Sequence, residues 1–195
     1  MLPFFFAVIG LAAASEAHPS ARRVAALYVR RTGIYPTLDG VDAWDVDADA
    51  RRYAGPWPIV AHPPCGPWGR FAYRTKQDKT LGPLAVDQVR TWGGVLEHPV
   101  DSRLWAAKGL PKPGEPPDAW GGWTLLVTQA SWGHRAPKWT WLYIVGVKPE
   151  ELPPRPPDVP DPGGRVEFMC EAERERTPPA FAEWLLEVAR RSSVR

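Results

Sequence analysis

Cysteine is scarce in this chain of 195 residues, which contains only Cys65 and Cys170. The two residues lie far apart in dissimilar surroundings, so a disulfide framework is not expected and a reducing, cytoplasmic location is predicted. Net charge is also small, because 24 Lys and Arg against 22 Asp and Glu give +2. A net charge this small does not favour binding of nucleic acid, although it is compatible with a local basic cleft.

The N-terminal extension, residues 1–22, begins with the apolar run MLPFFFAVIGLAAASEA. Its ending, with Ser15 and Ala17, imitates a signal peptide, but the basic start that such a peptide usually carries is missing. The run is too short to predict a membrane span, so no membrane partner is expected. An apolar helix packed on the domain, a misassigned start and an export signal are the alternatives for this segment.

Proline and tryptophan are abundant, with 24 and 11 residues. So much proline limits helix content and implies many fixed turns, whereas tryptophan offers flat faces for packing or for stacking on a ring-shaped ligand. With 44% hydrophobic residues, a chain of this length can bury one substantial core. We therefore expect one compact globular domain and a monomer.

The order of apolar segments predicts an α/β fold with a Rossmann-like open sheet. Strands are expected at 24–29, 57–65, 94–99 and 140–147, a short strand and a helical turn within 41–53, a helix at 79–93, and a helix or strand near 123–129. The predicted division is a Rossmann-like domain at 23–148, a proline-rich linker at 149–173, and a docking helix within 174–195 that starts at Thr177 as N-cap. In such a sheet the ligand crevice lies at the carboxyl ends of the strands.

Polar residues gather at three expected strand ends. The first has His62 and Cys65, the second has Glu97 and His98, and the third has His134, Arg135 and Lys138. A cysteine held behind two prolines at a strand end is exposed and stiffly aimed, which suits a nucleophile. The alternative is an inert buried thiol. The carboxylate and the cationic third segment favour the nucleophile.

Three motifs in the chain resemble those of the DNA cytosine-C5 methyltransferases. IVAHPPC resembles the Pro-Pro-Cys motif, VLEHP the Glu-Asn-Val/Pro motif, and WGHRAPKWTWLYIVG the Gly-x-Pro-Gln-x-Arg-x-Arg motif with its strand. The order is that of the family, and the likeness runs from about residue 41 to 147. A weaker segment, RERTPPAFAEWL, resembles the late Arg-x-Leu-Thr-x-x-Glu segment. The whole resembles a trimmed family member of phage or mobile-element type.

The resemblance implies that Cys65 attacks C6 of a flipped or single-stranded cytosine in DNA, or of a free nucleotide, while Glu97 contacts N3 and the exocyclic amine. Lys138 falls at the first Arg of the family motif and would bind the pyrimidine carbonyl or a phosphate. Asp45 stands where the family meets the adenine of S-adenosylmethionine, the implied methyl donor. The other candidate substrate-binding residues are His62, Pro64, Trp68, His98, His134 and Arg135.

The chain also departs from the family pattern. The Phe-x-Gly-x-Gly loop that carries the cofactor has no counterpart after VAALYV, where Gly33 stands alone. Thr140 replaces the second Arg of the late motif, and the proline-rich stretch leaves no room for a target-recognition domain. One alternative is therefore a non-catalytic relative that binds nucleic acid or a nucleotide. Another is a zinc-dependent hydrolase, because the three strand-end histidines together with Cys65 are typical zinc ligands.

Overall fold

A six-stranded sheet forms the centre of the computed structural model, which describes residues 22–194. The expectations for the N-terminal extension fall on residues 1–21 and lie outside this range. The sheet has the order β2-β1-β3-β4-β6-β5. The strands are β1 (Val24–Leu27), β2 (Val41–Trp44), β3 (Ile59–Ala61), β4 (Gly94–Pro99), β5 (Trp123–Thr128) and β6 (Trp139–Val145).

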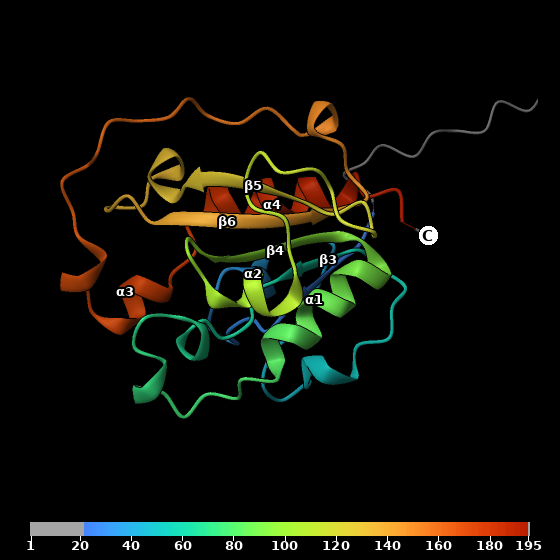
Figure 1. The fold of residues 1–195 in the computed structure, drawn as a ribbon, viewed down its shortest axis with the longest axis horizontal. Coiled ribbons are helices and arrows are strands. Elements are labelled where there is room, and N and C mark those ends of the chain that lie inside the picture. The colour runs from blue at the N-terminus through green and yellow to red at the C-terminus, as the bar shows by residue number, and fades with distance from the viewer. Residues whose placement is uncertain (1–21, 195) are drawn as a thin grey trace, which may run out of the picture.

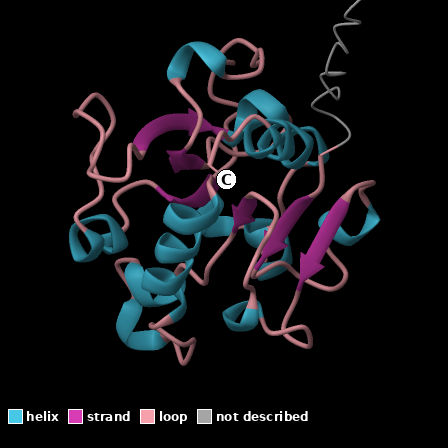
Figure 2. Cartoon of the chain, turned by 90° about the vertical axis from the view of Figure 1, so that its right-hand side faces the viewer, coloured by secondary structure: helices cyan, strands magenta, loops and turns pink. Residues whose placement is uncertain are grey.

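The first four strands along the chain run parallel, whereas β6 runs antiparallel to both of its neighbours, β4 and β5. The sheet is therefore mixed and open. The helices are α1 (Leu81–Trp92), α2 (Arg103–Lys108), α3 (Glu171–Glu175) and α4 (Pro179–Arg190). In Figure 1, α1 and α2 lie in front of the sheet and α4 lies behind it, and Figure 2 shows the same layers from the side. The predicted compact single α/β domain with an open sheet is confirmed.

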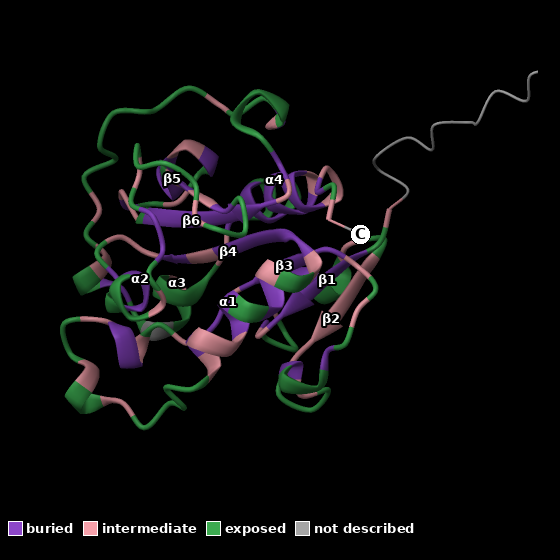
Figure 3. Ribbon diagram, turned by 45° about the vertical axis from the view of Figure 1, so that its right-hand side comes forward, coloured by how far each residue is buried: buried purple, intermediate pink, exposed green. Residues whose placement is uncertain are grey.

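Each face of the sheet has its own hydrophobic core. On one face Val60 and Val95 pack with Phe181 of α4, and on the other Ala61 and Leu96 pack with α1 and α2. Successive strand residues point to opposite faces, so a strand covered on both sides is mainly apolar, as β1 and β3 are. Figure 3 shows the result, with the central strands buried and the proline-rich stretch exposed.

Most predicted elements are present, with changes in detail. β4 has the predicted bounds, and the ambiguous segment near 123–129 is a strand. The N-cap prediction is wrong by one residue, because α4 is capped by Pro178 and begins at Pro179. Proline suits the first turn of a helix, since it lacks the N–H that would be unpaired there. None of the helices within residues 22–194 combines the length and the apolar character needed to cross a membrane.

The helix predicted to dock on the domain is α4. It packs against β1, β3 and β4 on one face of the sheet and buries Phe181 and Leu185 completely, so this helix is part of the domain core. The stretch assigned to the linker is extended for most of its length but contains helical turns at Pro149–Glu151 and Val166–Phe168. It also contains the start of α3, at Glu171.

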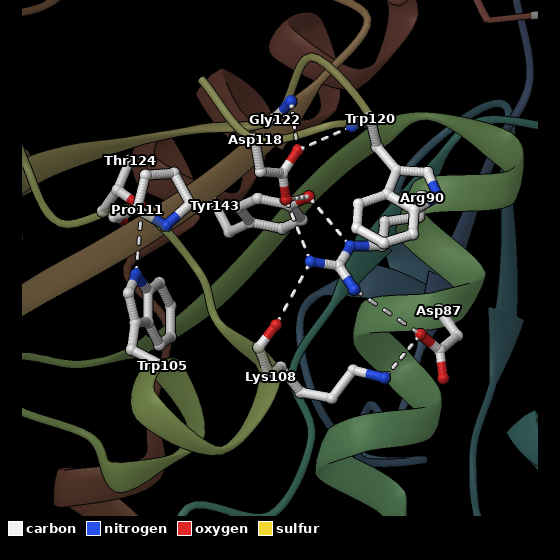
Figure 4. Close-up of polar contacts among 10 residues, drawn as sticks. All are labelled: Asp87, Arg90, Trp105, Lys108, Pro111, Asp118, Trp120, Gly122, Thr124 and Tyr143. Atoms are coloured by element: carbon white, nitrogen blue, oxygen red, sulfur yellow. Dashed lines mark hydrogen bonds and ion pairs between the residues drawn. The ribbon is translucent and has the colours of Figure 1, made fainter. Parts of the chain in front are cut away.

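A cluster around Arg90 holds the Pro/Gly-rich segment 110–122 against α1 (Figure 4). The Arg90 guanidinium lies 2.9 Å from a carboxylate oxygen of Asp118 and 3.7 Å from the ring centre of Trp120. The Tyr143 hydroxyl donates to the same Asp118 oxygen at 2.7 Å. Although burial alone would raise the pKa of Asp118, these hydrogen bonds lower it. The segment is thus fixed by buried polar contacts in place of its own regular structure.

Candidate active site

Residues from several elements meet at the edge formed by the carboxyl ends of β1, β3 and β4. Because β6 runs antiparallel to β4, residues just before β6 reach this same edge. His134, Arg135 and Lys138 lie in the connection between β5 and β6. β5 runs parallel to β4, because both strands are antiparallel to β6, so these residues follow the carboxyl end of β5 at this same edge.

Glu97, near the end of β4, lies at the centre of a hydrogen-bonded network. Its Oε2 is 3.0 Å from His62 Nδ1, and its Oε1 accepts from Gln129 Nε2 at 3.1 Å. The Thr140 hydroxyl donates to the same Oε1 at 3.4 Å. His62 Nε2 lies 2.7 Å from the hydroxyl of the buried Tyr35. Both carboxylate oxygens of Glu97 therefore have protein partners.

The network keeps Glu97 ionised. Burial alone would raise its pKa, but the hydrogen bond from His62 and the charge of Lys138 lower the pKa to about 2. An ionised carboxylate only accepts hydrogen bonds, so the Nδ1 of His62 donates to Glu97, while the Nε2 of His62 shares a hydrogen bond with the Tyr35 hydroxyl. Burial, and then the nearby Glu97, raise the pKa of Tyr35 well above its usual value.

Cys65 lies on the turn between β3 and the short helical segment Gly66–Trp68, and it is an exposed free thiol. Although its residue reaches solvent, desolvation by the protein packed around the sulfur raises the pKa of the thiol, and so does Glu97. The charges of Lys138 and Arg174 act in the opposite direction. Cys65 is thus within electrostatic reach of both Glu97 and Lys138.

His98 points to the opposite face of β4 from Glu97. It packs among the aromatic residues of the α1 and α2 side, with its ring 6.3 Å from that of Trp105. It is 1% exposed, and neither ring nitrogen has a hydrogen-bond partner among the described residues. Burial lowers the pKa of His98 to about 4; Glu97 and the Pro64 carbonyl oppose this shift, although that carbonyl is not in hydrogen-bond geometry with the ring. The imidazole is therefore neutral near pH 7.

A cavity of about 410 Å³ separates the Cys65 turn from the start of α2. It is lined by Cys65, Trp68, His98, Arg70 and Arg103, among others. Trp68 is 5% exposed, and its Nε1 also lacks a partner among the described residues. Each unpaired buried donor or acceptor costs about 1–3 kcal/mol, so this region is a place where a ligand would add hydrogen bonds.

The remaining candidates from the third segment face other partners. His134 Nδ1 lies 2.9 Å from the carbonyl oxygen and 3.1 Å from the backbone nitrogen of Ala136, while Arg135 forms an ion pair of 3.4 Å with Glu173 of α3. The three histidines therefore do not share one centre. Within residues 22–194, no group of three or more His, Cys, Asp or Glu is arranged to hold a metal ion, so the zinc alternative lacks a ligand set in this part of the chain.

α3 lies beside the same edge and is held there by two ion pairs. Glu173 pairs with Arg135 before β6, and Glu175 pairs with Arg30 after β1. Arg174, between the two glutamates, is the second residue, after Lys138, whose charge acts to lower the pKa of Cys65. The proline-rich stretch thus returns the chain to the candidate site before α4 begins.

The comparisons with known protein families, curated proteins and solved structures found no match for this chain. The candidate site is therefore interpreted from its own geometry and from the motifs described above.

The turn after β1, where the resemblance places S-adenosylmethionine, does not fit that cofactor. Tyr28 takes the left-handed conformation, with φ of 60°, that glycine would favour, and its hydroxyl donates to Gln88 at 2.7 Å. A Cβ on Gly33 would lie 3.1 Å from the Arg30 carbonyl oxygen, so this glycine packs closely within its own turn. Asp45 Oδ1 accepts from the backbone N–H groups of Asp47 and Ala48, which leaves only its second oxygen for a ligand.

Sequence reasoning missed Tyr35 and Gln129, and it treated Thr140 only as a departure from the family motif. Gln129 directly follows β5, so it carries the same signal as the other strand-end residues. It was overlooked because the segment near 123–129 was not assigned to a strand. Tyr35 begins the short 3-10 helix Tyr35–Thr37 between β1 and β2, and nothing in its local sequence indicates that it approaches His62.

Proposed function

We propose that the protein is a DNA cytosine-C5 methyltransferase-like enzyme that acts on a pyrimidine base through covalent attack by Cys65. The observation that carries the proposal is the exposed thiol at a strand end, within electrostatic reach of Glu97 and Lys138. The parallel order β2-β1-β3-β4 with helices on both faces supports a Rossmann-like arrangement. In that arrangement the crevice lies where the strand order reverses, beside β1 and β3.

The proposed chemistry begins with the Cys65 thiolate. Its electron pair forms the S–C6 bond while the C5=C6 π pair moves into the ring, through C4 to N3. A proton from solvent then adds at C5, and reversal of these steps releases the base with its C5 hydrogen exchanged. Burial and Glu97 raise the pKa of the thiol overall, and the charge of Lys138 acts in the opposite direction, toward the attacking thiolate. Ionised Glu97 can accept from an exocyclic amine but cannot donate to N3.

Methyl transfer from S-adenosylmethionine is the outcome that the resemblance implies. Because the turn after β1 does not fit this cofactor, the proposed reaction contains no step that uses S-adenosylmethionine. Calorimetry with S-adenosylmethionine tests the donor directly. Cytoplasmic location, a monomeric state and a DNA or nucleotide partner remain predictions.

Adduct formation tests the covalent step. The protein is incubated with a single-stranded oligonucleotide containing 5-fluorocytosine, with and without S-adenosylmethionine, and the complex is analysed by intact-protein mass spectrometry. We expect an added mass that maps to Cys65 and is absent from the Cys65→Ser variant. Deuterium incorporation at C5 of deoxycytidine monophosphate in D2O should likewise depend on Cys65. The proposal fails if the wild-type protein gives neither the adduct nor the exchange.

A second candidate function is a non-catalytic protein that binds nucleic acid or a nucleotide. It is favoured by the raised pKa of Cys65, which keeps the thiol protonated, and by the turn after β1. For this candidate, calorimetry should detect binding of a single-stranded oligonucleotide or a nucleotide but no binding of S-adenosylmethionine, and no adduct should form.

A further inference from the structure

The cavity beside the Cys65 turn, which we call the His98 cavity, contains a polar group without a partner. His98 lines this cavity, is almost completely buried, and has no hydrogen bond at either ring nitrogen within the described residues. A buried imidazole of this kind normally has at least one partner. The exception is explained if a ligand supplies the partner.

The cavity lies on the His98 side of β4 and not on the Glu97 side. Cys65 and His98 both line it, whereas Glu97 projects to the other face and bonds with His62 and Gln129. A ring placed in this cavity beside the thiol would lie next to His98. The ring nitrogens of His98 are covered by the protein, so the imidazole has to rotate for one of them to reach the ring. Its volume of about 410 Å³ lies in the range that holds a small organic ligand.

The chemistry of His98 matches the edge of a pyrimidine. A neutral imidazole offers one donor and one acceptor, and the edge of cytosine also presents donors and acceptors. Addition of a thiolate at C6 pushes negative charge toward N3, where a hydrogen-bond donor stabilises it. Ionised Glu97 cannot supply that donor, but an imidazole N–H can. Arg70 and Arg103, both exposed at the cavity, are suited to a phosphate group attached to the base.

We infer that the His98 cavity is the pyrimidine pocket and that His98 donates the hydrogen bond to the ring attacked by Cys65. This inference rests on the proposed covalent chemistry and assigns the contact with the ring edge to His98 in place of Glu97. The substrate class is a pyrimidine nucleotide, free or at an unpaired position of a strand.

The test compares His98→Leu, which removes both polar atoms, with His98→Gln, which keeps one donor and one acceptor. Both variants are made in a Cys170→Ser background so that Cys65 is the single thiol. The rate of adduct formation with the 5-fluorocytosine oligonucleotide is measured over a range of oligonucleotide concentrations. We expect His98→Leu to raise the half-saturating concentration or lower the maximal rate by about tenfold or more, and His98→Gln to restore most of the loss.

Alkylation of Cys65 by iodoacetamide provides the control, because this small reagent needs no base pocket. Its rate should stay within about twofold of wild type in both variants if the Cys65 turn is intact. If His98→Leu forms the adduct as fast as the wild type at every concentration, the inference is wrong while the proposed function stands.

A binding measurement separates the inference from the covalent chemistry. Deoxycytidine monophosphate is titrated into the wild-type protein while the imidazole resonances of His98 are followed by NMR, with His98→Leu as the reference for assignment. A shift of those resonances, with binding lost in His98→Leu, supports the pocket even if Cys65 forms no adduct, in which case only the covalent step fails. If the nucleotide leaves His98 unchanged, the inference is overturned.

Discussion

Glu97 and His98 are adjacent in the chain, yet the pleat of β4 gives them different environments. The carboxylate of Glu97 accepts hydrogen bonds from His62, Gln129 and Thr140 and is held ionised. His98 is buried, neutral and unpaired on the other face. This difference follows from the two-residue period of a strand, and it is the reason that these neighbours are assigned separate roles.

The first prediction at this scale concerns pH. His98 has a pKa of about 4 in the folded protein against a usual value of 6.5, so between these values the unfolded chain takes up a proton that the folded protein does not. Stability is therefore lost as pH falls through this window, by up to about 3 kcal/mol. Urea unfolding across the window should show this loss, and His98→Leu should remove it. An equal loss in the variant would contradict the prediction.

A second prediction concerns the charges around Cys65. Lys138 lowers the pKa of the thiol and Glu97 raises it, so Lys138→Met should slow alkylation by iodoacetamide below the thiol pKa, and Glu97→Gln should accelerate it. The rates are measured against pH by mass spectrometry in the Cys170→Ser background. A change of the same sign in both variants would show that the two charges do not act on Cys65 in this way.

At the scale of elements, the direction of β6 decides the composition of the site. A parallel sixth strand would place the residues before it at the far edge of the sheet, away from Cys65. Since β6 is antiparallel to β4, Lys138 and Arg135 lie at the same edge as Cys65. Arg135 then pairs with Glu173, so α3 is held at that edge as well.

The Arg90 cluster allows a matched test of an ion pair in two settings. The side chains of Arg90 and Asp118 are 7% and 9% exposed, whereas Asp87, which also contacts Arg90, is 54% exposed. Asp118→Ala leaves a buried charge without its partner and should lower the free energy of unfolding by about 3 kcal/mol or more. Asp87→Ala should change it by less than about 1 kcal/mol. Urea denaturation distinguishes the two, and equal effects would contradict the assignment.

At the scale of the whole molecule, the domain depends on both helical layers. α4 closes the face of the sheet that also carries Glu97, and its Phe181, Trp184 and Leu185 are buried against the strands. The C-terminal end of the chain therefore completes a core that begins with β1. Loss of this layer would expose the apolar residues on that face of the sheet.

A single substitution tests this layer. Phe181→Ala removes a fully buried ring and should cost about 3–5 kcal/mol of unfolding free energy. Glu183→Ala, on the exposed side of the same helix, should change stability by no more than about 0.5 kcal/mol. Thermal and urea unfolding measure both. A small effect of Phe181→Ala would show that α4 is not part of the cooperative core.

Much of the fold could be predicted because its signals are local. Apolar segments marked β1, β6 and the first half of β4, and a helical period ending at Gly93 marked α1. The cap of α4 and the strand at 123–128 were harder, because proline and mixed apolar patterns fit more than one local structure. The grouping of Cys65, Glu97 and Lys138 followed from the rule that sites form at strand ends.

The sequence by itself determined the α/β class, the positions of most strands, and the exposed cysteine behind two prolines, since each depends on neighbouring residues. Only the tertiary structure decided that β6 is antiparallel and that Tyr35 and Gln129 belong to the network of Glu97. It also decided that His98 lines a cavity without a partner. These properties depend on contacts between residues far apart in the chain, and no local pattern specifies which side chains will meet.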